Sequence, residues 1–269
     1  MRSPSSLPGL LRASHPAPTV AVTTLTALLA VGAGHGLGTG ALVTAAVGTG
    51  QLTIGWSNDL IDAARDRQVG RLDKPLALGD VSPALVRAAL VAAAVLCVGL
   101  SLACGLASAA VHLLLGVASG WAYNLGLKST AWSAVPYAVA FGALPAVVTL
   151  ALPEPRLPPV WMVAAGALLG VGAHLLNALP DLADDAQTGV HGLPHRLGAR
   201  TLRWLAPLVL VVASAVTVLG PGATAWWAWW PFALCLVLAG VAMGGRGRLP
   251  FLAAIGIAAV DVISLALRA

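Results

Sequence analysis

The chain has 269 residues, of which 58% are hydrophobic and only 9% are charged. About a quarter of the residues in an ordinary soluble domain are charged, so this composition excludes a typical soluble protein and indicates a polytopic membrane protein. The formal net charge is +5, but the basic residues lie in short stretches between apolar segments, which argues against a nucleic-acid-binding surface. We therefore expect the lipid bilayer, and no nucleic acid, among its partners.

Apolar segments recur along the whole chain with about the 20-residue length that a membrane-spanning helix needs. They predict an all-α fold, a polytopic bundle of nine transmembrane helices around a central cavity that opens to the cytoplasmic side. The predicted spans are Pro18–Leu37, Thr39–Trp56, Pro83–Cys104, Ser108–Leu127, Trp132–Leu152, Val160–Leu176, Leu202–Leu219, Ala225–Met243 and Pro250–Leu267. We expect residues 1–15 to form a short cytoplasmic tail and residues 16–269 to form one membrane domain.

Basic residues lie almost entirely on one side of this predicted bundle. Every Lys and Arg except Arg156 and Arg268 falls at the N-terminus or close to the connections that follow the second, fourth, sixth and eighth helices. Loops rich in Lys and Arg stay in the cytoplasm. The pattern therefore predicts a multi-pass protein of the inner cell membrane with its N-terminus in the cytoplasm.

Acidic residues are concentrated on the same predicted side. Eight of the ten form two clusters, one after the second helix (Asp59, Asp62, Asp66, Asp73 and Asp80) and one after the sixth (Asp181, Asp184 and Asp185). Solvated loops alone would scatter their acids among all the connections. We therefore interpret the two clusters as parts of one site.

A shared spacing relates the two clusters. Both contain the pattern N-x-x-x-D-x-x-x-D, formed by Asn58, Asp62 and Asp66 and again by Asn177, Asp181 and Asp185. Residues four apart project from one face of a helix. Carboxylates so close together repel one another unless a cation neutralises them, and Mg²⁺ combines one or two carboxylates with oxygens of phosphate and water. The clusters therefore predict a diphosphate held through Mg²⁺, which would also stabilise charge on a leaving diphosphate.

These motifs resemble those of a known family. The N-D-x-x-D-x-x-x-D motif from Asn58 to Asp66, the D-x-x-x-D motif from Asp181 to Asp185, the Y-N-L-G-L-K segment from Tyr123 to Lys128 and the nine-helix count are similar to the UbiA superfamily of intramembrane prenyltransferases. The resemblance covers approximately residues 18–267. It implies that both Asp motifs bind Mg²⁺ and the diphosphate of an isoprenoid donor.

The resemblance also implies a role for individual side chains. Tyr123 and Lys128 are expected to face the active site, with Lys128 in direct contact with the diphosphate, although a lysine at a helix end is also a common membrane anchor. Lys74 precedes a proline where many family members have Arg-Pro. The expected catalytic residues are Asp62, Asp66, Asp181, Asp185, Tyr123 and Lys128; the expected diphosphate-binding residues are Asn58, Asp59, Lys74, Asn177 and Arg196; and the expected Mg²⁺ ligands are Asp59, Asp62, Asp66, Asp181 and Asp185.

Several other polar and aromatic side chains lie inside the predicted spans. His174 lies one heptad before Asp181 and is expected either to face the cavity or to hydrogen-bond within the packing. Asp261 is isolated from both clusters, and its two expected roles are a buried general base and a group that pairs with the backbone or reaches solvent. The side chains expected to wall the cavity, where an aromatic face would stabilise an allylic cation, are Trp56, Trp121, Tyr137 and Phe141.

The function predicted from these features is Mg²⁺-dependent transfer of an isoprenoid group from a prenyl diphosphate to a small-molecule acceptor, expected to be aromatic. Two alternatives stay open. A terpene cyclase of the same superfamily would let the allylic cation attack its own double bonds and would need no acceptor. A membrane transporter would share the helix count, but acids clustered on one side and few charges at mid-membrane depth do not outline a transport path.

Overall fold

The computed structural model describes residues 7–71, 74–179, 182, 190–222, 226–246 and 249–268. Within these ranges every regular element is a helix, which confirms the all-α prediction. Asp73 and the second acid cluster, with Asp181, Asp184 and Asp185, lie outside the described residues. The site is therefore described below from its first acid cluster.

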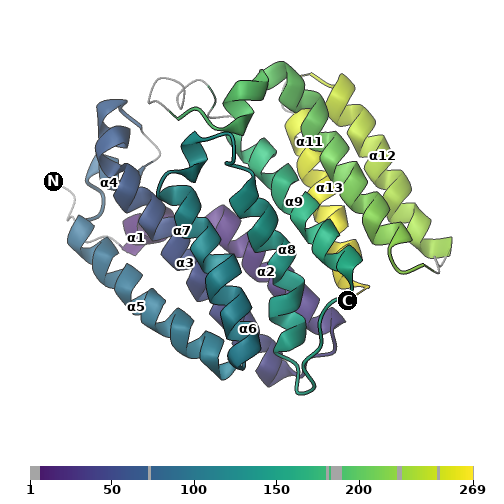
Figure 1. Cartoon of the computed structure of the whole chain (residues 1–269). Helices are drawn as coiled ribbons and strands as arrows, with labels where there is room; N and C mark the ends of the chain where they lie inside the picture. The colour runs from purple at the N-terminus through teal and green to yellow at the C-terminus, as the bar shows by residue number, and fades with distance from the viewer. Residues whose placement is uncertain are drawn as a thin grey trace.

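Most of the chain lies in long helices joined by short connections. Their bounds are α1 (Leu7–Ala13), α2 (Pro16–Gly32), α3 (Leu37–Gln68), α4 (Pro75–Leu78), α5 (Pro83–Ala103), α6 (Leu106–Val111), η1 (His112–Val117), α7 (Ala118–Asn124), η2 (Leu127–Ser129), α8 (Val135–Leu150), α9 (Val160–Ala178), α11 (Leu193–Leu219), η3 (Trp226–Ala228), α12 (Trp229–Gly244) and α13 (Leu249–Ala266). Figure 1 shows α4 and the start of α11 at one end of the bundle and the α8–α9 connection at the other.

Seven of the described helical segments are long and apolar enough to cross a membrane. They are α3, α5, the continuous segment Leu106–Asn124, α9, α11, Trp226–Gly244 and α13. The pair α1 and α2 passes the same test together but is bent by 67°, and α8 is apolar but has only 16 residues. The predicted count of nine spans requires α2 and α8 to cross as well, and it stays a prediction.

Helix α3 carries the acid motif because it is unusually long. Its 32 residues correspond to about 48 Å at 1.5 Å per residue, whereas the hydrocarbon core of a bilayer is about 30 Å thick. The apolar first part of α3 therefore accounts for the span, and the helix continues without a break through Asn58, Asp62 and Asp66. The second helix therefore extends well beyond the predicted span Thr39–Trp56 and includes the polar motif.

Glycines bring α8 and α9 into close contact. A Cβ atom at Gly166 would lie 2.5 Å from the carbonyl oxygen of Phe141, and one at Gly170 would collide with the carbonyl oxygen of Tyr137. Small residues at such positions let the backbones of membrane helices approach each other. The contact fixes the face of α8 that carries Tyr137 and Phe141 against the large core shared by α2, α3, α8, α9, α11, α12 and α13.

The N-terminal segment packs on α3, although the sequence suggested a tail outside the membrane domain. The indole Nε1 of Trp56 donates to the carbonyl oxygen of Leu10 at 3.0 Å, and a Cβ at Gly55 would collide with the carbonyl oxygen of Ser14. Trp56 is buried with Ala13 in a second apolar cluster. The prediction that Trp56 lines the cavity is therefore wrong, because its ring packs against the connection between α1 and α2. The boundary after residue 15 itself stays a prediction.

Candidate active site

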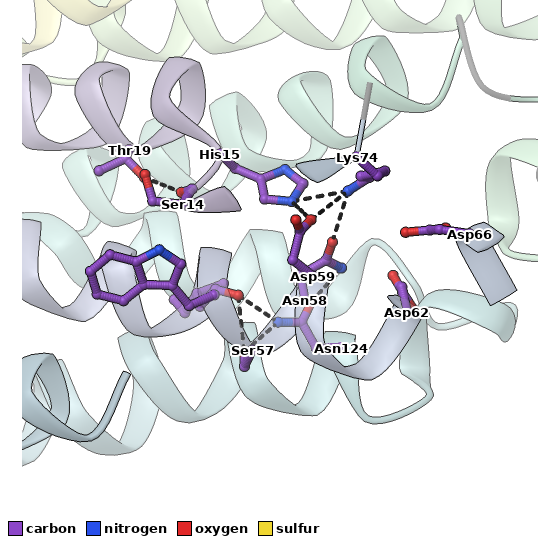
Figure 2. Close-up of polar contacts among 12 residues, drawn as sticks. Ser14, His15, Thr19, Ser57, Asn58, Asp59, Asp62, Asp66, Lys74 and Asn124 are labelled. Carbon is purple, nitrogen blue, oxygen red and sulfur yellow. Dashed lines mark hydrogen bonds and ion pairs between the residues drawn. The ribbon is translucent and has the colours of Figure 1, made fainter. Parts of the chain in front are cut away.

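Three carboxylates lie buried at the C-terminal end of α3. Only 1%, 7% and 4% of the side chains of Asp59, Asp62 and Asp66 are exposed. Asp62 and Asp66 lie one helical turn apart, next to Asn58 and Asp59, as the spacing predicts (Figure 2). Burying a charge is costly unless it is paired, so the partners of these acids define the site.

Lys128 is the main partner of Asp62. Its Nζ donates to both carboxylate oxygens, at 2.5 and 2.6 Å, from the short helix η2 that follows α7. Burial lowers the pKa of Lys128 and the charge of Asp62 opposes that shift. Since Lys128 points at an acid and only 10% of its side chain is exposed, its contacts are not those of a membrane anchor.

Arg65 contacts both Asp62 and Asp66. Its guanidinium lies 3.1 Å from Oδ2 of Asp62 and 3.6 Å from Oδ1 of Asp66. The residue is part of α3 itself, so the motif supplies one of its own counter-ions through the i, i+3 neighbourhood of a helix. Asp62 therefore lies between two cations.

Asp59 is held by two bases from distant parts of the chain (Figure 2). Its Oδ1 lies 3.0 Å from Nζ of Lys74 and 3.0 Å from Nε2 of His15, and those two nitrogens are 3.1 Å apart. Lys74 was predicted at the site and lies there. His15 was not predicted, because it lies 44 residues before Asp59 in the chain and only the fold of the α1–α2 corner brings it close.

A second residue that the sequence did not single out, Asn124, joins α7 to α3. Its Nδ2 donates to the carbonyl oxygen of Ile54 and to Oγ of Ser57, both at 2.9 Å. Its Oδ1 accepts from Nδ2 of Asn58 at 3.2 Å. The only sequence signal for Asn124 was its place beside Tyr123 in the segment that carries the family resemblance. These hydrogen bonds hold the end of α7 against α3, and Lys128 follows α7 by only four residues.

An aromatic cluster connects α7, α8 and α9. The rings of Tyr123 and Tyr137 meet edge to face with centroids 5.2 Å apart, and the ring of His174 lies 4.9 Å from that of Tyr137. Phe141 stacks on Tyr137 from the next turn of α8. His174 is buried and its Nε2 lies 3.0 Å from Oγ of Ser133, so of its two expected roles the hydrogen-bonded packing is the one its contacts describe. Asn177 forms a side-chain hydrogen bond with Tyr137.

The bundle also contains a small, partly open hollow. Its described lining is mostly apolar, from α2, α3, η1 and α8, and Phe141, Gln51 and His112 belong to it. Gln51 lies seven residues before Asn58 on α3, on the same face and about 10 Å deeper along the helix axis. The hollow thus lies deeper along α3 than the acids, and Phe141 belongs both to its lining and to the aromatic cluster. A cavity open to the cytoplasm stays a prediction.

Several predicted residues lie elsewhere. Arg196 is exposed, and its described contact is a bond from Nε to the carbonyl oxygen of His191 at 3.4 Å, away from the acids of α3. Trp121 donates to Oγ1 of Thr53 at 3.3 Å. Asp261 of α13 is buried against α11 and α12, where Ser214 and Cys235 donate to its Oδ1. Its described partners are therefore side chains, and not the backbone or solvent that the sequence led us to expect.

The oxygen ligands of α3 suit Mg²⁺ in kind, because Mg²⁺ prefers carboxylate and carbonyl oxygens. Oδ2 of Asp59 is buried without a hydrogen-bond partner, which leaves a ligand atom available. In the part of the chain that the structure describes, no three acidic, His or Cys side chains are grouped closely enough to hold a metal by themselves. The predicted second motif, which would complete the ligand set, lies outside that part.

Comparison with known proteins agrees with this arrangement of a helical membrane bundle around buried acids. A profile of the UbiA prenyltransferase family matches residues 19–251. The chain belongs to this family, whose members are prenyltransferases, and it is an integral membrane protein with several spanning helices. No curated protein sequence matches it.

Solved structures of related proteins share the fold. The apo structure of a UbiA homologue from Aeropyrum pernix K1 is similar with a TM-score of 0.72 and 20% identity, over 90% of this chain and 96% of that one. A UbiA homologue from Archaeoglobus fulgidus bound to GPP and Mg²⁺ has a TM-score of 0.69 and 15% identity, over 97% and 100%. A structure of digeranylgeranylglyceryl phosphate synthase has a TM-score of 0.69 and 16% identity, over 97% of both chains.

Proposed function

We propose that this protein transfers an isoprenoid group from a prenyl diphosphate to an aromatic acceptor in a Mg²⁺-dependent reaction. The observation that carries the proposal is the burial of Asp59, Asp62 and Asp66 beside basic side chains, at the end of a helix whose inner face continues past aromatic rings into an apolar bundle. The Archaeoglobus fulgidus homologue bound to GPP and Mg²⁺ supports the same choice of donor and metal.

The residues that would hold Mg²⁺ are Asp59, Asp62, Asp66, Asp181 and Asp185. Bound there, Mg²⁺ would supply positive charge that stabilises the diphosphate as it leaves. The orphan Oδ2 of Asp59 supports this assignment.

Basic side chains of the site would bind the diphosphate. Lys128 already lies against Asp62 at 2.5 Å, and an ammonium group with three donors binds carboxylate and phosphate oxygens equally well. We propose that Lys128 and Lys74 turn part of their hydrogen bonds from the acids to the diphosphate when the donor binds. Asn58 and Asn177 would border the same space, and Arg196 would reach it only if its exposed side chain turned inward.

The aromatic cluster would face the isoprenoid after its bond to the diphosphate oxygen breaks. Tyr123, Tyr137 and Phe141 present rings whose faces attract a cation, and the surrounding bundle keeps water away from it. The acceptor ring would then form a bond to the allylic carbon and release a proton. The small, mostly apolar hollow beside Phe141 would have to widen to take the isoprenoid tail.

We further propose nine spans, with the site facing the cytoplasm across the inner cell membrane. The end of α3, η2, α4 and the α1–α2 corner meet at one end of the bundle, where most Lys and Arg residues also lie. Loops with this charge stay in the cytoplasm. Residues 16–269 would form the membrane domain, with residues 1–15 on its cytoplasmic side.

Product analysis with the purified protein tests the proposed function. Prenyl diphosphates of different length are incubated with Mg²⁺, with and without candidate aromatic acceptors. A prenylated aromatic product that requires both Mg²⁺ and acceptor is expected. A cyclic hydrocarbon formed without acceptor would instead identify a terpene cyclase, and stable donors in every mixture, with solute flux in vesicles, would identify a transporter.

A further inference from the structure

His15 contacts the acid motif from a part of the chain that the proposed reaction does not otherwise use. We infer that His15 is a positioning residue, whose Nε2–H fixes one oxygen of Asp59 so that the other oxygen remains directed toward the metal and diphosphate site. This inference rests on the proposed function, because it assigns a task to the first acid of the proposed Mg²⁺ site.

The two oxygens of Asp59 have different surroundings. Oδ1 lies 3.0 Å from both His15 and Lys74, whereas Oδ2 is buried and has no hydrogen-bond partner. The residue as a whole is 1% exposed, so water does not replace that partner from the surface. A carboxylate with one oxygen held by hydrogen bonds and the other without a partner can bind a metal ion through the second oxygen.

The imidazole of His15 restrains the orientation of the Asp59 carboxylate more than Lys74 does. A carboxylate only accepts hydrogen bonds, so we assign His15 the tautomer with its proton on Nε2, which donates to Asp59 across 3.0 Å. In this tautomer Nε2 does not accept from Nζ of Lys74, 3.1 Å away, and the Lys74 ammonium donates to Oδ1 of Asp59 instead. Lys74 carries three rotatable donors on a flexible stem, and it also lies 3.5 Å from Oδ1 of Asn58, so it restrains the orientation of Asp59 less. Partners of this kind orient metal-binding carboxylates in many proteins.

The backbone at His15 has a conformation that is uncommon for residues other than glycine. His15 has φ 54° and ψ 67°, a left-handed conformation that glycine and asparagine adopt more readily than other residues. Backbone strain of this type persists only where the surroundings enforce it, and it gathers at functional sites.

The surroundings do enforce it. Thr19 Oγ1 donates to the carbonyl oxygen of Ser14 at 3.0 Å, and Ser14 Oγ donates to that of Leu11 at 2.7 Å. Trp56 and Gly55 hold the same corner against α3. The corner is therefore rigid enough to deliver the imidazole to one atom.

Substitutions of His15 separate positioning from simple attachment of the corner. In His15→Gln the amide nitrogen takes nearly the place of Nε2 and keeps a donor. In His15→Asn the amide is too short to reach Asp59, yet asparagine tolerates the left-handed backbone, so this variant is expected to fold. His15→Ala removes the donor. The matched control is His35→Ala, because His35 bonds to Val148 and Thr39 at the opposite end of α3.

The measurement is binding of Mn²⁺, a paramagnetic substitute for Mg²⁺, to the full-length protein in the presence of inorganic diphosphate, followed by electron paramagnetic resonance. We expect His15→Asn and His15→Ala to bind Mn²⁺ about 10-fold more weakly, as is typical when an outer partner of a metal ligand is lost. His15→Gln is expected to stay near the unmodified protein, and His35→Ala to match it. The thermal unfolding midpoint without metal is measured in parallel.

Each outcome decides the question. Equal Mn²⁺ affinity in His15→Ala and the unmodified protein would overturn the inference while leaving the proposed function intact. Equal losses in His15→Gln and His15→Asn, with lower unfolding midpoints in both, would show that His15 only fastens the corner. A failure of the unmodified protein to bind Mn²⁺ with diphosphate would overturn both the inference and the proposed metal site.

Discussion

Each acid at the end of α3 is buried together with a base, and this pairing explains how three carboxylates coexist in a chain with so few charges. The ion pair of Lys128 and Asp62 is the shortest, at 2.5 Å, and Arg65 extends it to Asp66. Removing one member of such a pair leaves the other charge buried and uncompensated. The cations therefore offset the cost of burying these carboxylates.

The charge of Lys128 is expected to make activity depend on pH. Burial lowers the pKa of its ammonium group from the ordinary value of 10.5. The charge is present at low pH and is lost as pH rises through the lowered pKa, so we expect kcat/KM for the prenyl diphosphate to fall on the alkaline side before pH 10.5. Lys128→Arg keeps its charge to about pH 12 or above and should move that fall to higher pH.

The pH profile of kcat/KM for both proteins checks this expectation. Lys128→Met, which has no charge at any pH, should lower kcat/KM about 100-fold at neutral pH, the effect of losing one preorganised donor. An identical alkaline limb in Lys128→Arg and the unmodified protein would mean that another group titrates there.

Sequence spacing was sufficient to predict the acids of α3, because the four-residue repeat of Asn58, Asp62 and Asp66 maps directly onto one face of a helix. It could not predict His15, since nothing local marks a histidine at a helix corner as the partner of an acid 44 residues away. Lys128 was placed correctly at the acids through its motif. The diphosphate contact of Arg196 stays a prediction, because the second acid cluster lies outside the described residues.

At the scale of elements, the contact between α8 and α9 determines where the aromatic cluster lies. Gly170 of α9 faces the backbone of Tyr137, and the ring of Tyr137 meets those of Tyr123 and His174. A change in the separation of these two helices would therefore move these rings relative to one another.

Gly170→Ala should both destabilise the protein and lower its turnover. The added methyl group would collide with the carbonyl oxygen of Tyr137, and overpacking of this kind costs about 1–3 kcal/mol. The control is Gly99→Ala in α5, where an added Cβ has no neighbour within 4 Å and alanine improves the helix propensity. Thermal unfolding in detergent and product formation are measured for both.

A Gly170→Ala protein as stable and active as Gly99→Ala would show that α8 and α9 can separate without cost. The proposed alignment of the aromatic rings would then lose its structural basis.

The positions of the helices could be predicted from the length of the apolar segments, but their irregularities could not. The predicted span Ser108–Leu127 is a helix, but residues His112–Val117 form a π-helical turn within it, with His112 bonded to Ser101 at 2.8 Å. The α1–α2 bend likewise depends on contacts with Trp56 and Gly55. Apolar periodicity carries no information on such tertiary contacts.

At the scale of the whole molecule, the distribution of Lys and Arg predicts a membrane topology, which can be tested by labelling cysteines introduced one at a time. In a cysteine-free background, Gln68→Cys, Glu154→Cys and Arg246→Cys each place one thiol at an exposed position in or beside a connection. We expect a membrane-impermeant maleimide to label Glu154→Cys in intact cells, and to label the other two only after the membrane is opened. The reason is the predominance of Lys and Arg on the side of Gln68 and Arg246.

Labelling of Glu154→Cys on the same side as Gln68→Cys would mean that an even number of spans separates them. The short helix α8 would then not cross, and the count of nine would be wrong.

The central claim is that the carboxylates of α3 make turnover of a prenyl diphosphate depend on Mg²⁺. The most direct test is the rate of diphosphate release from geranyl diphosphate in the presence of the aromatic acceptor, by the purified protein with and without Mg²⁺, for the unmodified chain, Asp62→Asn and the control Asp80→Asn. Asp80 pairs with Arg12 at the surface. We predict that chelation of Mg²⁺ abolishes release, that Asp62→Asn lowers it at least about 100-fold, and that Asp80→Asn retains it. Mg²⁺-dependent release at an unchanged rate by Asp62→Asn would contradict the claim.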